Sequence, residues 1–150
     1  MAVKRMDHTT LVVRGLDAAV AFFEALGMEV EGRAHVSGDA VDRLHGASDG
    51  AERVAADLVM LVTPDSHSRI ELTRYVTPDV VEPTPWPLPV HVVGWANVMF
   101  EVDDLRETVA RLEAVGGSLV GEVVAWEGVI LLAYVRGPEG VVVALAQPVE

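Results

Sequence analysis

Hydrophobic and polar residues alternate along this chain in a pattern that predicts short strands and amphipathic helices. The first segment alternates with a period of two, which predicts a strand with His8, Thr10 and Val12 on one face. Apolar residues at helical spacing follow, and Gly27 can supply the left-handed residue that ends a helix. Asp17 is expected to cap this helix, because its carboxylate can accept from the free N–H groups of the first turn. The pattern therefore predicts a strand that runs into a helix.

The same order returns in the second half of the chain. Asn97 stands 89 positions after His8, and several of the apolar residues that follow match at the same spacing. The segment around Asn97 is again a predicted strand, with Asn97, Met99 and Glu101 on one face, and it again runs into a predicted helix. A repeat of this length indicates two similar supersecondary units, neither of which is expected to bury its apolar face alone.

Each half is predicted to have the order β-α-β-β-β, which places the chain in the α+β class. In the first half, strands are expected at residues 7–13, 28–34, 54–62 and 68–76, with a helical turn over 40–45. In the second half, strands are expected at residues 95–102, 118–125, 129–135 and 141–147, with a helix that begins at Leu105 and is capped by Asp103 or Asp104. Thr77 to Pro89 contains five prolines and is expected to be extended. We therefore expect one domain over 1–150, with module one at about 6–76, a connector at 77–93 and module two at about 94–148.

Charge and composition exclude several classes of partner. The 23 acidic residues outnumber the 11 Lys and Arg residues, which gives a formal net charge of −12. Nucleic acids and anionic membranes both attract Lys and Arg, so neither is an expected partner. The chain has no Cys and hence no disulfide, thiolate nucleophile or Cys-based metal site. It shows no signal peptide and no apolar run of membrane-spanning length, and a cytoplasmic location is expected.

Several segments match a known family pattern. They are His8, Leu16-Asp17-Ala18-Ala19-Val20-Ala21-Phe22-Phe23, Ile70-Glu71-Leu72, Val102-Asp103-Asp104-Leu105 and Tyr134-Val135-Arg136-Gly137-Pro138-Glu139-Gly140. With two β-α-β-β-β modules, they resemble the vicinal oxygen chelate superfamily, which includes glyoxalase I, extradiol dioxygenases, methylmalonyl-CoA epimerase and bleomycin-type resistance proteins. The resemblance covers nearly the whole chain. It implies that a pseudo-twofold rotation relates the modules and that their mixed sheets curve into an open cup.

The resemblance also implies where a metal would bind. In this superfamily the cup commonly holds one divalent metal, and the positions that match its ligands are His8, Glu71, Asn97 and Ala144. Asn97 offers only a neutral amide oxygen, and Ala144 offers no donor atom. Stable zinc sites use three or four protein ligands, so His8 and Glu71 alone are expected to bind a metal weakly. No tightly bound cofactor is therefore expected, and a divalent metal (Zn, Ni, Mn or Fe) is the alternative.

Further side chains fall on the predicted cup face or near its mouth. The expected ligand pocket comprises His8, Thr10, Thr73, Tyr75, Trp95, Asn97, Met99 and Ala144. If the protein is an enzyme, Glu71 and Glu101 are the candidates for catalytic proton transfer, although Glu101 could equally lie in water at a strand end. Trp95 and Trp126 are candidates either for an aromatic wall or for ordinary packing. His35, His45 and His67 lie in or beside predicted loops and are expected to be solvated.

Two functions follow from this reading. The first is a binding protein, without metal or poor in metal, that holds a hydrophobic small molecule in its cup. The second is a lyase, isomerase or dioxygenase that uses His8 and Glu71 to hold a metal, or Glu71 and Glu101 to move protons. The missing half of the metal site favours binding. By resemblance, the protein is expected to be a homodimer.

Overall fold

The computed structural model describes residues 3–47 and 52–150 of the chain. The chain divides into two compact units between Val81 and Glu82, inside the proline-rich connector. Each unit contains an open mixed sheet and one main helix, which confirms the predicted α+β class. No helix in the described part of the chain is long and apolar enough to cross a membrane.

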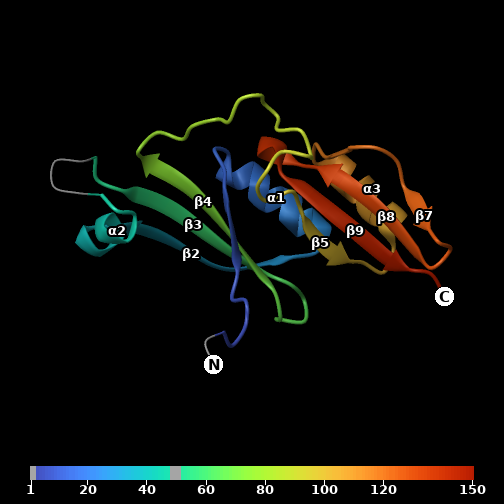
Figure 1. The fold of residues 1–150 in the computed structure, drawn as a ribbon. Coiled ribbons are helices and arrows are strands. Elements are labelled where there is room, and N and C mark those ends of the chain that lie inside the picture. Colours follow the sequence, from blue (N-terminus) through green and yellow to red (C-terminus); the bar gives the residue numbers. More distant parts are fainter. Residues whose placement is uncertain (1–2, 48–51) are drawn as a thin grey trace. The chain divides into compact units, whose positions relative to one another are not determined.

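The first unit is built on a four-stranded sheet with the order β1-β4-β3-β2 (Figure 1). Its elements are β1 (Thr9–Val12), α1 (Leu16–Leu26), β2 (Glu29–Ser37), α2 (Asp39–Leu44), β3 (Ala55–Val62) and β4 (Arg69–Thr77). β1 pairs with β4 in parallel, whereas the other neighbours are antiparallel. The short helix α2 coincides with the predicted helical turn.

Helix α1 packs against β2, β3 and β4 and covers one face of the first sheet. Phe22, Phe23 and Leu72 of this core are almost completely buried. Gly27 ends the helix in the left-handed conformation, with φ of 118°. The prediction for Asp17 was wrong: Gly15 is the N-cap, and no side chain caps the helix. Asp17 instead lies in the first turn, where a carboxylate interacts favourably with the helix dipole.

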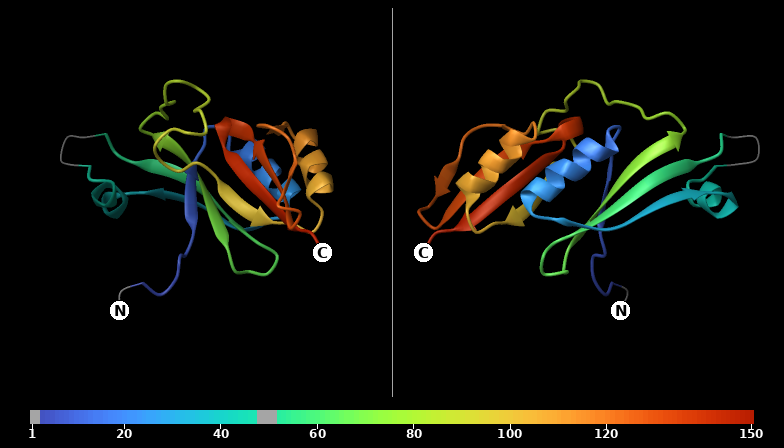
Figure 2. Two further views of the ribbon diagram at one scale, coloured as in Figure 1. Left: turned by 45° about the vertical axis from the view of Figure 1, so that its right-hand side comes forward. Right: turned by 180° about the vertical axis from the view of Figure 1, so that it is seen from behind.

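The second unit has a five-stranded sheet, in which β5-β9-β8-β6 form the main order and β7 also pairs with β8. Its elements are β5 (Val98–Glu101), α3 (Leu105–Ala114), β6 (Ser118–Leu119), β7 (Val124–Trp126), β8 (Ile130–Arg136), the 3-10 turn η1 (Pro138–Gly140) and β9 (Val142–Pro148). α3 packs on β6, β8 and β9, and the view from behind shows it across one face of this sheet (Figure 2, right). Of the two predicted caps for α3, Asp104 is the one observed, because its side chain accepts from the Glu107 N–H at 2.9 Å.

The single strand predicted over Ser118–Ala125 is wrong. Two short strands, β6 and β7, take its place, and both pair with β8. Leu119 pairs with Val135 and Val124 pairs with Leu132, so this side of the ladder has two more residues than β8 has. The extra residues leave the ladder, as in a large bulge, which a pattern of apolar residues does not reveal.

The connector packs against a turn of the second unit. A Cβ atom placed on Gly140 would lie 3.2 Å from the Trp86 ring and 3.3 Å from Pro87. The Arg136 guanidinium donates to the Gly140 carbonyl at 3.1 Å and to the Leu88 carbonyl at 3.4 Å. Trp86 therefore packs on the turn that contains Gly140.

Candidate functional site

The two parallel strand pairs have the same register, which gives a structural test of the predicted repeat. In the first unit Thr10 of β1 lies opposite Glu71 of β4. In the second unit Met99 of β5 lies opposite Ala144 of β9. Met99 follows Thr10 by the same 89 positions that separate Asn97 from His8. Ala144 is therefore the structural counterpart of Glu71.

One hydrogen bond at the end of each strand pair repeats as well. The Val13 N–H donates to the Thr73 carbonyl at 2.9 Å, and the Val102 N–H donates to the Ala146 carbonyl at 2.9 Å. Both bonds lie just beyond the paired strands and lead into the main helix of their unit. The backbone thus repeats, whereas the side chains that it carries do not.

His8 and Glu71 lie next to each other on the face of the first sheet that α1 does not cover. The His8 Nε2 atom is 3.6 Å from Glu71 Oε2, and the two side chains are 31% and 19% exposed. Thr73, two residues along β4, donates from its hydroxyl to Glu71 Oε1 at 2.9 Å. His8, Glu71 and Thr73 therefore form one polar cluster, with the carboxylate in its middle.

Asp7 fixes the orientation of the His8 ring. The His8 Nδ1 atom lies 2.8 Å from Asp7 Oδ2, and Asp7 also accepts from the Arg5 guanidinium at 3.0 Å. The hydrogen bond from His8 is the main reason why the pKa of Asp7 lies below its ordinary value, and Arg5 acts in the same direction. Because Nδ1 is engaged by Asp7, Nε2 is the atom that His8 presents to Glu71.

The matching positions of the second unit supply much weaker donors. Asn97 comes just before β5 and offers an amide oxygen. Ala144 is completely buried on β9, with Met99 and Tyr134 as its partners on the two neighbouring strands. In the described part of the chain, no three His, Asp or Glu side chains gather where they could hold a metal ion. Tight zinc sites use three or four protein donors, and His8 and Glu71 are the two strong donors at the four positions that match the family pattern.

The other predicted pocket residues differ in exposure. Thr73 is buried, and Tyr75 is partly buried on the same face of β4. Thr10 and Met99 are exposed on their strands, and Glu101 is exposed at the end of β5. Trp95 is 92% exposed, before β5 begins. Trp126 is also exposed, at the end of β7 rather than in the predicted turn.

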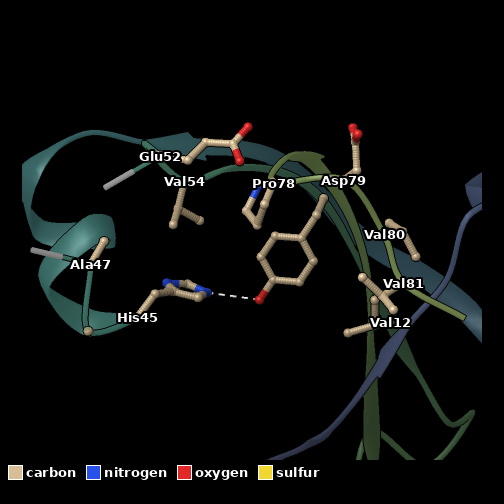
Figure 3. Close-up of a pocket in the computed structure, with 11 residues that line it drawn as sticks. Val12, His45, Ala47, Glu52, Val54, Pro78, Asp79, Val80 and Val81 are labelled. Carbon is tan, nitrogen blue, oxygen red and sulfur yellow. Dashed lines mark hydrogen bonds between the residues drawn. The ribbon is translucent and has the colours of Figure 1, made fainter. Parts of the chain in front are cut away.

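A cavity of about 370 Å³ lies at the far end of the first sheet (Figure 3). Its described lining residues come from β1, the residues directly after α2 and directly before β3, β4 and the connector: Val12, His45, Gly46, Ala47, Glu52, Val54, Tyr75, Pro78, Asp79, Val80 and Val81. Neither His8 nor Glu71 is among them. Of the predicted pocket residues, only Tyr75 lines this cavity.

Sequence reasoning missed His45, which was expected to be merely solvated. Its Nε2 atom lies 2.8 Å from the Tyr75 hydroxyl, and its Nδ1 atom lies 2.9 Å from the Val41 carbonyl. The His45 and Tyr75 rings meet edge to face, with centroids 5.6 Å apart. No local signal joins two residues that stand 30 positions apart, because α2 and β4 meet only through the tertiary fold.

His35 also has specific partners. It lies on β2, and its Nδ1 atom is 2.8 Å from Asp57 Oδ1, while Arg74 donates to the other carboxylate oxygen. The His35 hydrogen bond first, and the Arg74 hydrogen bond second, place the pKa of Asp57 below its ordinary value. His35 is exposed, as expected, but it lies within β2 rather than beside a loop, and it takes part in a cross-strand ion pair.

Comparisons with known proteins agree with this geometry. The family model described as the glyoxalase/bleomycin resistance protein/dioxygenase superfamily matches residues 5–145. A glyoxalase family protein from Bacillus cereus is 42% identical, with a TM-score of 0.90, over 100% of this chain and 99% of that one. The comparison with curated proteins found no match.

More distant solved structures share the fold. A mutant of glyoxalase I from Zea mays is 19% identical, with a TM-score of 0.68, over 97% of this chain and 46% of that one. The fosfomycin resistance protein FosX from Listeria monocytogenes is 14% identical, with a TM-score of 0.63, over 98% of this chain and 95% of that one. At these identities the likeness concerns the fold and not the chemistry.

Proposed function

Because the chain belongs to the glyoxalase/bleomycin resistance protein/dioxygenase superfamily, we propose that it binds a hydrophobic small molecule without a tightly held metal. The ligand would lie against the face of the first sheet that carries His8 and Glu71. There the first unit offers the polar cluster of His8, Glu71 and Thr73. A mostly apolar surface with a few polar anchors is typical of small-molecule sites.

The observation that supports this proposal is that Glu71 and Ala144 occupy equivalent positions in the registers of the two parallel strand pairs. At the place where the first unit has a carboxylate, the second unit has a completely buried methyl group. The chain thus supplies His8 and Glu71 as strong donors and, at Asn97, one neutral amide oxygen. A metal bound by so few groups exchanges readily, because metal affinity grows with the number of charged ligands that converge on the ion.

One feature favours the alternative of a metal-dependent lyase, isomerase or dioxygenase. Metal-binding histidines commonly donate their second ring N–H to a carboxylate, which orients the ring. The contact between His8 Nδ1 and Asp7 Oδ2, at 2.8 Å, has this form, and it turns Nε2 toward Glu71. This second candidate depends on a metal that His8 and Glu71 hold.

Metal analysis of the full chain, purified without chelator and dialysed, separates the two functions. We expect far less than one zinc, nickel, manganese or iron per chain. Glu71→Gln should abolish whatever occupancy remains, while Asp57→Asn, which alters a second carboxylate paired with a histidine, should not. One metal per chain that survives dialysis and disappears in E71Q would overturn the proposal and favour the enzyme.

A further inference from the structure

We propose that the cavity beside His45 and Tyr75 is a separate binding site for a small aromatic amine. Such a ligand has an apolar body and a single positive charge. The inference rests on the proposed function in one respect, namely that the chain binds small molecules. It differs from the proposed function in two ways: the ligand binds beside His45 and Tyr75 instead of His8 and Glu71, and the ligand carries a positive charge.

The cavity has the size and the walls of a small-molecule site. Its volume of about 370 Å³ lies within the range of ligand pockets, roughly 300–1,000 Å³. Apolar side chains from three parts of the first unit form most of the described wall: Val12 of β1, Val54 before β3, and Pro78, Val80 and Val81 of the connector. Tyr75 lines the same cavity. An aromatic body would bury apolar surface here and could stack on the Tyr75 ring.

The hydrogen bonds of His45 determine what the Tyr75 hydroxyl can offer a ligand. The Val41 carbonyl can only accept, so the Nδ1 atom of His45 donates to it. In the neutral ring, Nε2 is then an acceptor, and the Tyr75 hydroxyl donates its hydrogen bond to it. The Tyr75 oxygen is left with lone pairs and no proton for a ligand. It therefore favours a ligand that donates a hydrogen bond, as an ammonium group does.

The charges around the cavity favour the same ligand. Glu52 and Asp79 are its charged lining residues in the described part of the chain, and no Lys or Arg lines it there. Arg53, the neighbour of Glu52, pairs with Asp39 at 2.7 Å and with Asp42 at 2.6 Å, so its charge is already matched. Two carboxylates at the edge of a concave apolar wall attract a cation and repel an anion.

The site is distinct from the cluster around His8. Tyr75 lies four residues beyond Glu71 on the same face of β4, a separation of about 13 Å at the usual rise of a strand. His8, Glu71 and Thr73 are not among the described lining residues. A bicyclic amine that fills the cavity therefore does not reach the His8 ring.

Three probes of the same shape test the charge preference on the full chain. Titration calorimetry would compare 2-naphthylmethylamine, 2-naphthylmethanol and 2-naphthoate at neutral pH. We expect the amine to bind about tenfold tighter than the alcohol, because two partly solvated carboxylates each contribute a modest attraction. The carboxylate probe should bind most weakly. Equal affinities for all three, or no binding of the amine at millimolar concentration, would overturn the proposal.

Variants then locate the bound amine. Glu52→Gln with Asp79→Asn should remove the preference for the amine over the alcohol. Asp17→Asn with Glu24→Gln changes the net charge equally on exposed positions of α1 and should leave the preference intact. Tyr75→Phe keeps the ring, removes the acceptor and should weaken amine binding several-fold, and thermal melts would check that the variant is folded.

The result also separates this inference from the proposed function. If Glu71→Gln weakens amine binding and the changes at Glu52 and Asp79 do not, the amine binds at the His8 cluster. The proposed function would then stand, and the inference would be wrong. If one metal per chain survives dialysis while amine affinity still depends on Glu52, Asp79 and Tyr75, the inference stands and the proposed function is wrong.

Discussion

The Nε2 atom of His8 lies 3.6 Å from the Oε2 atom of Glu71, although the two residues come from opposite ends of the first unit. The parallel pairing of β1 with β4 produces this contact, because it sets Thr10 beside Glu71 and leaves His8 two residues away on the same face. The second unit repeats the pairing with Met99 and Ala144. The same parallel strand pairing thus carries a polar cluster in the first unit and the apolar pair Met99 and Ala144 in the second.

Thr73 stabilises this polar cluster, which Thr73→Val can test. The substitution keeps the shape of the side chain and removes the hydroxyl that donates to Glu71. Since Thr73 is buried, we expect a loss of about 1 kcal/mol in the free energy of unfolding. Denaturant unfolding would measure it. Thr10→Val, an exposed change on the same face, should alter stability by less than about 0.5 kcal/mol. Equal effects of the two variants would contradict this role of Thr73.

Gly117 closes the turn after α3 and has no room for a side chain. A Cβ atom there would lie 2.8 Å from the Leu112 carbonyl oxygen, which is backbone and cannot move aside. Gly117→Ala should therefore destabilise the protein by about 1–3 kcal/mol. Gly121 lies in the loop between β6 and β7, and a Cβ atom there would meet no other atom within 4 Å, so Gly121→Ala should be neutral or slightly stabilising. Thermal melts of the two variants would compare them directly, and a stable G117A protein would refute the steric argument.

Asp57 makes the first unit sensitive to acid. Its pKa lies below the ordinary value of 3.8 because His35 and Arg74 both donate to its carboxylate. A group whose pKa is lower in the folded chain stabilises the fold above its unfolded pKa, and this stabilisation is lost as the pH falls through the folded pKa. Between about pH 5 and about pH 2, the melting temperature should therefore fall less in Asp57→Asn than in the wild type. An equal fall in both proteins would show that the ion pair does not contribute.

Much of the fold follows from local patterns in the sequence. The alternation in β4 placed Glu71, Thr73 and Tyr75 on one face, and the spacing in α1 identified the helix that Gly27 ends. Both signals come from residues that are neighbours in the chain, so no tertiary information is needed. The predicted boundaries differ from the observed ones by a few residues, because strand ends depend on the partner strand as well as on the pattern.

The features that sequence reasoning missed depend on contacts between distant residues. The bulge between β6 and β7 exists because β8 is shorter than the segment that pairs with it. His45 meets Tyr75 because α2 brings its last turn to the end of β4, and no spacing in the chain encodes that meeting. The ion pair of His35 was missed for the same reason, since its partner Asp57 lies opposite it on the adjacent strand β3, 22 positions along the chain.

Ala144→Glu should make the second unit less stable than in the wild type. Ala144 is completely buried, with Met99 and Tyr134 opposite it on the two adjacent strands, so the substitution introduces both extra volume and a charge that has no partner. Met99 is 56% exposed on β5, so Met99→Glu, the matched control, should change the free energy of unfolding far less. Thermal melts would compare the two variants, and equal melting temperatures would contradict the burial argument.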